Sequence, residues 1–319
     1  MTDAPGIRAR AFAQTWLGRL SGWLLAWVGA IVLVQILVAL APGDAIDTLP
    51  DPGLRAQLTA EWGLGGPLAT RVIAGTWHAL IGAWGSSWTV RPGDSVGGLV
   101  ATAMGASAPM LVAAWAVAVG LGAAVRGRGW GEKVVVGLST LPVVLLALGA
   151  IEGINAAVWA GMSAGWWGRP AFFALPMEGG VVRDALALVA LGVGSAGVAA
   201  VAARLAEADA RIDASGFVLA ARARGMTVSA LRSLKWRHRV VPLIEGAQAA
   251  FPPIVGGLVV VERLCALPGA GDLLWRAVEA RDIPVATGVV VALTGTTVVV
   301  GAALDLLRRA WDPRLRAEA

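Results

Sequence analysis

LSGWLLAWVGAIVLVQILVALAPG, residues 20–43, is the first long run of this sequence without a charged residue. A helix needs about 20 apolar residues to cross a hydrocarbon core about 30 Å thick, so this run is long enough for one membrane crossing. Five further charge-free runs follow along the chain: Ser95–Val125, Val134–Ile151, Ala185–Ala203, Gly246–Val261 and Ile283–Leu304. We therefore predict an all-α membrane protein with six transmembrane helices.

The composition supports this fold class. Of the 319 residues, 57% are hydrophobic and only 15% are charged, whereas soluble domains carry about 25% charged residues. The run Ser95–Val125 exceeds one crossing, so we expect its first third, with Gly97 and Gly98, to be a lead-in to the helix. The run Gly246–Val261 is short, so we expect that Val240–Ile244 extends it or that its ends lie in the membrane interface.

The distribution of Lys and Arg predicts the orientation of the chain. With the N-terminus inside, the cytoplasmic segments are 1–20, 125–133, 204–245 and 305–319, and they hold 3, 3, 8 and 4 of the 26 basic residues. An excess of Lys and Arg in cytoplasmic loops is the expected sign for this orientation. Both termini are then cytoplasmic. Loops facing anionic membrane lipid explain the net charge of +5, and we expect no nucleic-acid partner.

Residues that carry metal or catalytic chemistry are scarce. Cys265 is the only cysteine, and the predicted topology places His78 and His238 on opposite sides of the membrane. We therefore expect no intrachain disulfide, thiolate cluster or shared metal. The glycine-rich stretch Gly127–Lys133 lacks the Gly-Lys-Ser/Thr with which a P-loop holds phosphates. We expect no catalytic residue, metal or cofactor on this chain.

Two long segments are predicted to lie outside the cytoplasm. Residues 42–94 are too polar to span, and we expect a small cap that lies partly on the membrane surface. Aromatic rings are enriched at the membrane interface, so we interpret each of four tryptophans first as an interfacial anchor: Trp62, Trp77, Trp84 and Trp88. Residues 152–184 combine aromatic rings with Pro170 and Pro176, which favours an interfacial or re-entrant helix.

The basic segment 204–245 contains the stretch Leu-Ala-Ala-Arg-Ala-Arg-Gly at residues 219–225. Its alanines favour a helix and allow close approach of a neighbour, while Gly225 can adopt the left-handed conformation that ends a helix. Thr227 or Ser229 is a candidate cap for a following short amphipathic helix, which would end before membrane entry at Pro242. This pattern predicts a rigid element parallel to the membrane. A solvated basic loop is the alternative.

A family resemblance rests first on this stretch. Ala221–Met226 resembles the Ala-Arg-Ala-Lys-Gly-Leu form of the "EAA" loop in permease subunits of binding-protein-dependent ABC importers. In particular it is similar to the first-permease type of the dipeptide/oligopeptide/nickel family. The usual Asp-Tyr before this element is replaced by Gly216-Phe217, which keeps the ring and loses the acid and the hydroxyl.

Further matches occur in the family's order along the whole chain. They are Ala41–Asp44, Trp62–Leu64 with Pro67, Leu68 and Arg71, Gly85–Ser87, Val261–Glu262, Leu267–Gly271 with Arg281–Asp282, Asp305–Leu307, and Asp312–Arg316. The segment 152–184 aligns poorly with the family pattern.

The resemblance implies a type I ABC importer permease with both termini cytoplasmic. It divides the chain into 1–98 (helix 1 plus the cap) and 99–319 (the core domain), with the coupling loop at about 213–242. Contact with the ATPase is expected from Phe217, Ala220, Ala221, Arg222, Ala223, Arg224, Gly225 and Met226. The extracytoplasmic loop at the mouth of the pathway is expected to contain Glu262, Pro268, Gly269, Gly271, Arg281 and Asp282.

The implied partners are a second homologous permease, two cytoplasmic ABC ATPases that hold the ATP and Mg, and an extracytoplasmic solute-binding protein. The implied site of action is a bacterial or archaeal plasma membrane, and the implied cargo is a peptide or a related small solute. A self-sufficient secondary transporter or channel is the main alternative, although no predicted span contains a charged residue. A membrane-embedded enzyme is less favoured because no catalytic set converges.

Three positions inside or beside the spans carry separate expectations. Glu245 can be structural or functional with equal weight, because it lies at the edge of a span where water is within reach. Gln35 is interpreted as a residue that makes a helix-packing hydrogen bond rather than as a substrate ligand. Pro252-Pro253 predicts a kink or a break in the fifth helix.

Overall fold

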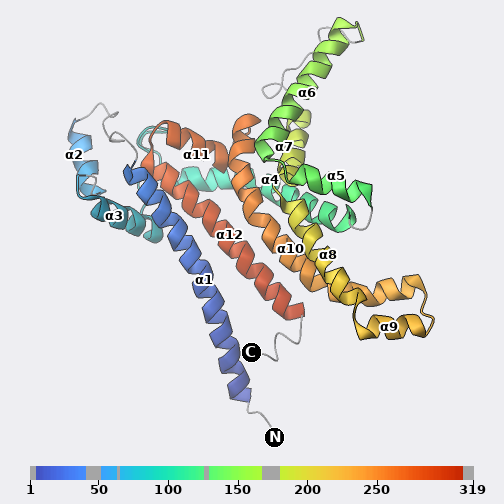
Figure 1. Cartoon of the computed structure of the whole chain (residues 1–319). Helices are drawn as coiled ribbons and strands as arrows, with labels where there is room; N and C mark the ends of the chain where they lie inside the picture. Colours follow the sequence, from blue (N-terminus) through green and yellow to red (C-terminus); the bar gives the residue numbers. More distant parts are fainter. Residues whose placement is uncertain (1–4, 41–51, 63–64, 126–128, 167–179, 312–319) are drawn as a thin grey trace. The chain divides into compact units, whose positions relative to one another are not determined.

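The computed structural model describes residues 5–40, 52–62, 65–125, 129–166 and 180–311 (Figure 1). The helices in these ranges are α1 (Pro5–Leu40), α2 (Pro52–Glu61), α3 (Leu68–Ile81), α4 (Val96–Val125), α5 (Trp130–Ser139), α6 (Val143–Ser163), α7 (Gly180–Gly194), α8 (Gly197–Asp213), α9 (Gly216–Ala223), α10 (Val228–Leu264), α11 (Ala270–Glu279) and α12 (Ile283–Trp311). Within the same ranges the β-structure is a single bridge between Ser86 and Ser95. The predicted all-α fold class is confirmed.

Five helical segments are long and apolar enough to cross a membrane: Ser21–Leu40, Val96–Val125, Val143–Ser163, Val228–Leu264 and Ile283–Trp311. The pair α7 and α8, which is bent by 40° at a short break, makes a sixth span if the two helices are taken together. The six predicted spans therefore correspond to the upper count.

Two predicted spans have different bounds in the structure. The predicted lead-in at Gly97 and Gly98 is helical, because α4 begins at Val96 and the Ser95 hydroxyl accepts a hydrogen bond from the Gly98 N–H. The bounds predicted for the span at Val134–Ile151 are wrong, because this run is divided between α5 and α6. Pro142 has no N–H and restricts the residue before it, so α5 ends at Ser139 and a new helix begins after the proline.

The segment predicted outside at 152–184 is therefore partly helical, since α6 continues to Ser163. The remaining aromatic and proline residues of this segment at 167–179 lie outside the described residues. The run Ala185–Ala203 was predicted as one helix, but it is interrupted between Gly194 and Gly197.

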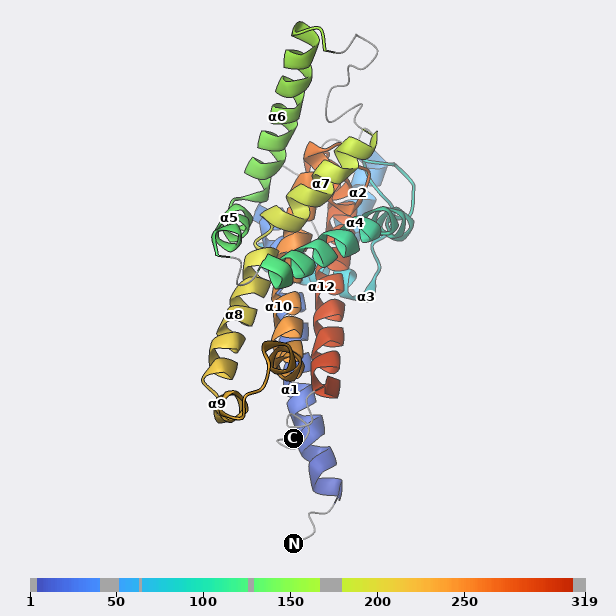
Figure 2. The same cartoon turned by 90° about the vertical axis from the view of Figure 1, so that its right-hand side faces the viewer.

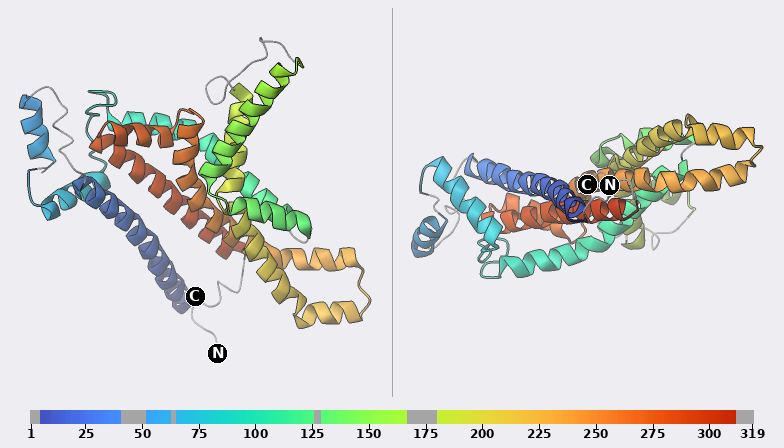
Figure 3. Two further views of the ribbon diagram at one scale, coloured as in Figure 1. Left: turned by 45° about the horizontal axis from the view of Figure 1, so that its top comes forward. Right: turned by 90° about the horizontal axis from the view of Figure 1, so that it is seen from below.

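Helix α10 is longer and more continuous than predicted. It runs from Val228 through Pro242, Pro252 and Pro253 to Leu264. The prediction of a separate short helix that ends before Pro242 is therefore wrong, and so is a break of the helix at Pro252-Pro253. Figures 1 and 3 show that α10 nevertheless changes direction after its first turns, which run beside α9. The predicted extension of Gly246–Val261 by Val240–Ile244 is confirmed.

The chain forms two compact units. Unit 1 comprises residues 1–13, 110–266 and 300–319, and unit 2 comprises residues 14–109 and 267–299. In unit 1, α8 lies along α10 (Figure 2), with Val201, Leu205 and Ala250 in its core. Small residues allow the helices to approach closely, since a Cβ on Gly246 would lie 2.9 Å from the Val201 Cα.

Unit 2 is held together by contacts between α1, α3 and α12. Ile31, Ala79 and Val291 form a buried cluster, and the side chains of Trp27 and Trp84 pack against it. Gln35, which is 4% exposed, donates from Nε2 to the Thr287 hydroxyl at 3.1 Å. This contact between α1 and α12 agrees with the interpretation of Gln35 as a packing residue.

The tryptophans of the cap do not share one role. Trp62 and Trp88 are buried, and Trp62 stacks on His78 with ring centroids 5.1 Å apart, so their interpretation as interfacial anchors is wrong. Their rings instead form the small core of the cap. Trp77 is 62% exposed, as an interfacial anchor requires, whereas the half-buried Trp84 donates from its indole to the Ala79 carbonyl at 3.1 Å.

Candidate functional site

The basic segment folds into a hairpin of three helices, α8, α9 and the first turns of α10 (Figures 1 and 3). Gly225 has φ of +73°, the left-handed conformation predicted for the turn after α9. The Thr227 hydroxyl caps α10 by accepting from the Ala230 N–H at 3.4 Å, as predicted. The predicted helical character of the Ala-Arg-Ala stretch is confirmed, since Gly216–Ala223 forms α9.

An acid that sequence reasoning missed fixes the hairpin. Asp213, the last residue of α8, accepts a charged hydrogen bond from the Lys235 ammonium and lies 3.4 Å from Arg222 Nη2. The hydrogen bond from Lys235, followed by the charges of Lys235, Arg222 and Arg239, lowers the pKa of Asp213, which lies at the cytoplasmic end of α8 outside its apolar part. Arg222 thus has an acidic partner on its own chain.

Two further contacts join the arms of the hairpin. Arg239 Nε donates to Asp209 Oδ1 at 2.6 Å, and both side chains are mostly buried. The rings of Phe217 and His238 lie 4.9 Å apart at their centroids. Charge-assisted hydrogen bonds are about twice as strong as neutral ones, so the Arg239–Asp209 pair holds α8 against α10, while the ring contact joins α9 to α10.

The outer face of the hairpin is exposed. Ala221 of the predicted contact set is buried, as is the neighbouring Val218. The other members of the set are exposed: Phe217, Ala220, Arg222, Ala223, Arg224, Gly225 and Met226. Leu219, beside them, is 58% exposed. Arg224 makes no ion pair with any residue that the structure describes. Within the predicted contact set, Arg224 is therefore an exposed positive charge beside apolar side chains.

The Arg281-Asp282 motif meets the Gly85–Ser87 motif in unit 2. Asp282 is completely buried, and its Oδ2 accepts from the Ser87 hydroxyl at 2.6 Å. The same oxygen accepts from the backbone N–H of Trp88, Thr89 and Val90, at 3.0, 2.9 and 3.1 Å. We call this arrangement the Asp282 clasp. It ties the loop before α4 to the first turn of α12.

The other predicted mouth residues lie around the ends of α10 and α11. Glu262 is 2% exposed in α10, while Pro268 is exposed in the turn that follows. Gly269 and Gly271 are buried beside Ala270, whose N–H donates to the Ser107 hydroxyl at 2.8 Å. Arg281 adopts φ of +55° before the clasp. Of these predicted residues, Asp282 is the one whose hydrogen bonds reach the 85–90 loop, and the role of the set at the mouth of the pathway stays a prediction.

Glu245 is paired at the cytoplasmic side of unit 1. Arg308 Nη1 donates to Glu245 Oε1 at 2.7 Å, and Arg308 Nε lies 3.9 Å from Asp305 Oδ1. One turn further along α10, Gln248 Nε2 donates to the Gly301 carbonyl at 3.1 Å. These contacts tie the cytoplasmic end of α12 to α10, the helix that continues from the hairpin.

Comparisons with known proteins agree with this arrangement. Residues 116–317 match the family described as "Binding-protein-dependent transport system inner membrane component". This chain belongs to that family. It is 29% identical over 316 residues to a putative peptide permease protein of Brucella ovis, with 92% of this chain and 95% of that protein covered. It is 26% identical over 312 residues to the glutathione transport system permease protein of Salmonella typhi, with 94% and 98% covered.

The family and the apolar helices together place the chain. It is a multi-pass inner-membrane component of a bacterial ABC importer, and its transport system includes ATPase and solute-binding partners. The resemblance to the dipeptide/oligopeptide/nickel permeases is confirmed at the level of the family and of these relatives.

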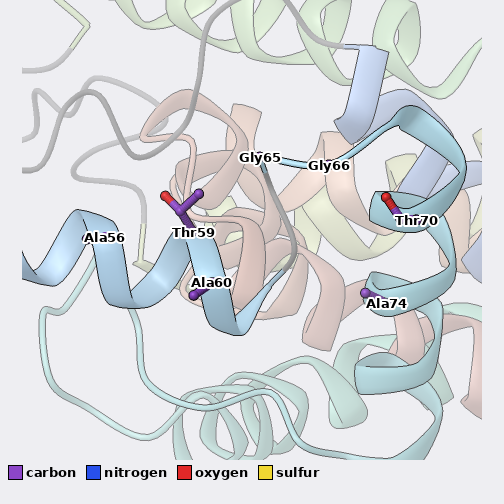
Figure 4. A pocket seen from close by; sticks show the side chains of 7 residues that line it. All are labelled: Ala56, Thr59, Ala60, Gly65, Gly66, Thr70 and Ala74. Carbon is purple, nitrogen blue, oxygen red and sulfur yellow. The ribbon is translucent and has the colours of Figure 1, made fainter.

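Other candidate sites in the described residues are weaker. No group of three or more His, Cys, Asp or Glu side chains gathers there in a way that could hold a metal ion. Figure 4 shows a shallow hollow between α2 and α3 whose lining lacks charged side chains: Ala56, Thr59, Ala60, Gly65, Gly66, Thr70 and Ala74. The motifs at 41–44, 63–64 and 312–316 lie outside the described residues.

Proposed function

We propose that this permease carries a peptide or a peptide-like small solute, and that its α8–α9–α10 hairpin receives the movement of an ATPase subunit. The proposed assembly contains a second homologous permease, two ATPases that bind all the ATP and Mg, and an extracytoplasmic solute-binding protein. The chain itself is proposed to catalyse no reaction and to hold no cofactor. The cargo class is supported by the relatives, whose names assign peptides or glutathione to those proteins.

The observation that carries the coupling proposal is the bracing of α9. Asp213 holds Arg222 and Lys235, and the Phe217 ring lies against the His238 ring, tilted by 30°. A push on an unbraced loop would be absorbed by rotation of its backbone, whereas a braced helix moves as one body with the helices attached to it. The continuity of α10 from the hairpin into the membrane then provides a direct mechanical path.

The two arginines of the stretch 219–225 have two different roles in this proposal. Arg222 is engaged by Asp213 and stiffens the hairpin, whereas Arg224 remains exposed and is proposed to meet an acid of the ATPase. Gly225 is required because its φ of +73° is disfavoured for residues with a Cβ. The exposed side chains of Leu219 and Met226 would enter an apolar groove of the partner.

The test is ATP-driven uptake by the complete transporter in proteoliposomes, with a labelled tripeptide and labelled glutathione as probes. Arg224→Glu should leave the assembled complex as stable as wild type but reduce uptake and ATP hydrolysis together, because the contact between the subunits is lost. Arg211→Glu is the control, since Arg211 is also exposed, lies on α8 and pairs with Glu207 one turn away. Equal uptake by both variants would contradict the assignment of the contact.

The same vesicles separate the proposal from its main alternative. The permease reconstituted alone should move neither probe, because its helices have no source of energy. Concentrative uptake by the isolated chain, driven by an ion gradient, would instead show a self-sufficient secondary transporter. Uptake of neither probe by the complete and ATP-hydrolysing transporter would overturn the cargo class while leaving the coupling proposal intact.

A further inference from the structure

The span made of α7 and α8 is interrupted at Ser195-Ala196. The two helices are bent by 40° at this break, and Ala196 has φ of +59° and ψ of +1°. Figure 2 shows α8 continuing from α7. This left-handed conformation is disfavoured for a residue with a Cβ and persists only where the surroundings impose it. Glycine, which adopts it freely, occurs at 194 and 197 but not at the strained position itself.

The interruption meets a second interruption. The Ala196 N–H donates to the Ser139 carbonyl at 3.0 Å. Ser139 is the last residue of α5, and the next helix, α6, begins after Pro142. Each break leaves backbone groups without their helical partners, and in a membrane those groups must find partners within the protein. The two breaks satisfy part of this requirement for each other.

One polar group at the break is left over. Ser195 is 6% exposed, and its buried hydroxyl has no hydrogen-bond partner among the residues that the structure describes. A buried unpaired hydroxyl is unfavourable, and native proteins pair almost all such groups. A partner available in a second conformation of the helices would account for a serine here.

The helices on both sides of the break are tightly confined. A Cβ on Gly194 would lie 2.7 Å from Leu146 Cδ1, and a Cβ on Gly197 would lie 3.1 and 3.2 Å from the Cβ atoms of Ala118 and Ala250. Close-packed helices resist internal deformation, so a change in the angle between α7 and α8 would concentrate in the two residues of the break. Hinges are commonly a few residues at the ends of elements that absorb φ/ψ changes.

We propose that Ser195-Ala196 is a hinge that positions α8 during transport, with the Ser139 carbonyl as its pivot. Helix α8 leads directly to Asp213 and the hairpin, so the hinge lets α8 and α9 move together while α7 follows by a smaller angle. The direction of this movement rests on the proposed coupling role of α9. The change of angle itself does not, and it can be measured separately.

The hinge is tested by electron paramagnetic resonance on the complete transporter, in the nucleotide-free and the ATP-trapped states. Spin labels at Val182→Cys and Ala210→Cys, in a Cys265→Ser background, place one label on each exposed arm. With arms of about 20 Å from 1.5 Å per residue, a change of about 20° in the 40° bend alters the separation by about 2–3 Å. Labels at Ala203→Cys and Ala210→Cys, both on α8, should keep their separation.

Ala196 variants provide a second measurement. Ala196 and Ala203 are both exposed, but only Ala196 has a positive φ. Ala196→Val should reduce uptake at least tenfold, whereas Ala203→Val should stay within about twofold of wild type because Val fits a helix with only a small loss of propensity. Ala196→Gly should raise the melting temperature and Ala203→Gly should lower it.

The outcomes separate the hinge from the coupling proposal. A change between the arms without an effect of the Arg224 variant would keep the hinge and reject the contact. An unchanged separation of Val182→Cys and Ala210→Cys in two states that differ elsewhere would overturn the hinge, even if the hairpin variants behave as expected. Equal uptake by the Val variants at 196 and 203 would also overturn it.

Discussion

The Asp282 clasp allows a prediction that is local, large and measurable. Replacing Asp282 with Ala removes the carboxylate oxygen that accepts from the backbone N–H groups of Trp88, Thr89 and Val90. Those three amides then lose their acceptor beside a side chain that is completely buried. The loop should open far more often, while the rest of the helices keep their packing.

The size of the effect follows from the contacts. A buried donor that loses its partner costs about 1–3 kcal/mol, and water can reach part of this loop once the carboxylate is gone, so we expect about 4 kcal/mol for the group of three. Each 1.4 kcal/mol corresponds to a factor of ten in an equilibrium. Protection of these amides should therefore fall by about three orders of magnitude. Asp282→Asn, which keeps one acceptor oxygen without the charge, should lose about one order.

Hydrogen–deuterium exchange of the peptide that covers residues 87–91 is the direct assay. Asp184→Ala is the matched control, because Asp184 is another acid at the start of a helix but its side chain is 53% exposed and paired only with Arg183 beside it. The control should leave exchange at residues 87–91 unchanged. A fall of less than tenfold for Asp282→Ala would refute the idea that this carboxylate holds the loop.

Three further outcomes are expected. Charge reversal of Glu245 or Arg308 alone should lower uptake at least tenfold by breaking their 2.7 Å ion pair. The double reversal should recover only part of the uptake, because Arg308 also lies 3.9 Å from Asp305. Full uptake in either single variant would argue against a role for the pair. Gly122→Ala would place a Cβ 2.6 Å from the Val201 Cβ on α8 and should destabilise the complex by about 1–3 kcal/mol, as measured by thermal unfolding. Gly120→Ala is the control, because the space around Gly120 is open, and it should not destabilise the complex. The pKa of Asp213 is lowered in the folded chain, so its stabilising ion pairs should persist from about pH 8 to about pH 5 and be lost only as the pH falls through that lowered pKa. Hydrogen exchange of the α9 amides measures this loss. A rise in their exchange already near neutral pH would contradict the prediction.

Much of the fold could be read from the sequence, because a membrane imposes one strong rule on long charge-free runs. The number of spans and the turn at Gly225 followed from that rule and from glycine's conformational freedom. The bounds of individual helices did not. Pro142 restarts a helix while Pro242 and Pro252 lie inside one, and the difference depends on which neighbours compensate for the lost hydrogen bond.

The bracing of the hairpin could have been found in part. Asp209 and Asp213 are one helical turn apart, as are Lys235 and Arg239, and antiparallel helices bring the first acid to the last base. The Asp282 clasp offered no such signal, because its donors are backbone amides nearly two hundred residues away. Every residue except proline has a backbone N–H, so the sequence does not indicate which amides act as donors.

The central claim, that movement enters through the α9 hairpin, is tested most directly by a reversible cross-link. Leu219→Cys, exposed on α9 in a Cys265→Ser background, is oxidised against a cysteine scanned along the ATPase surface of the complete transporter. The account predicts that a disulfide between the two subunits forms, that it stops ATP-driven uptake, and that a reductant restores both. Failure to form a cross-link at any ATPase position, or undiminished uptake with the subunits fully linked, would contradict it.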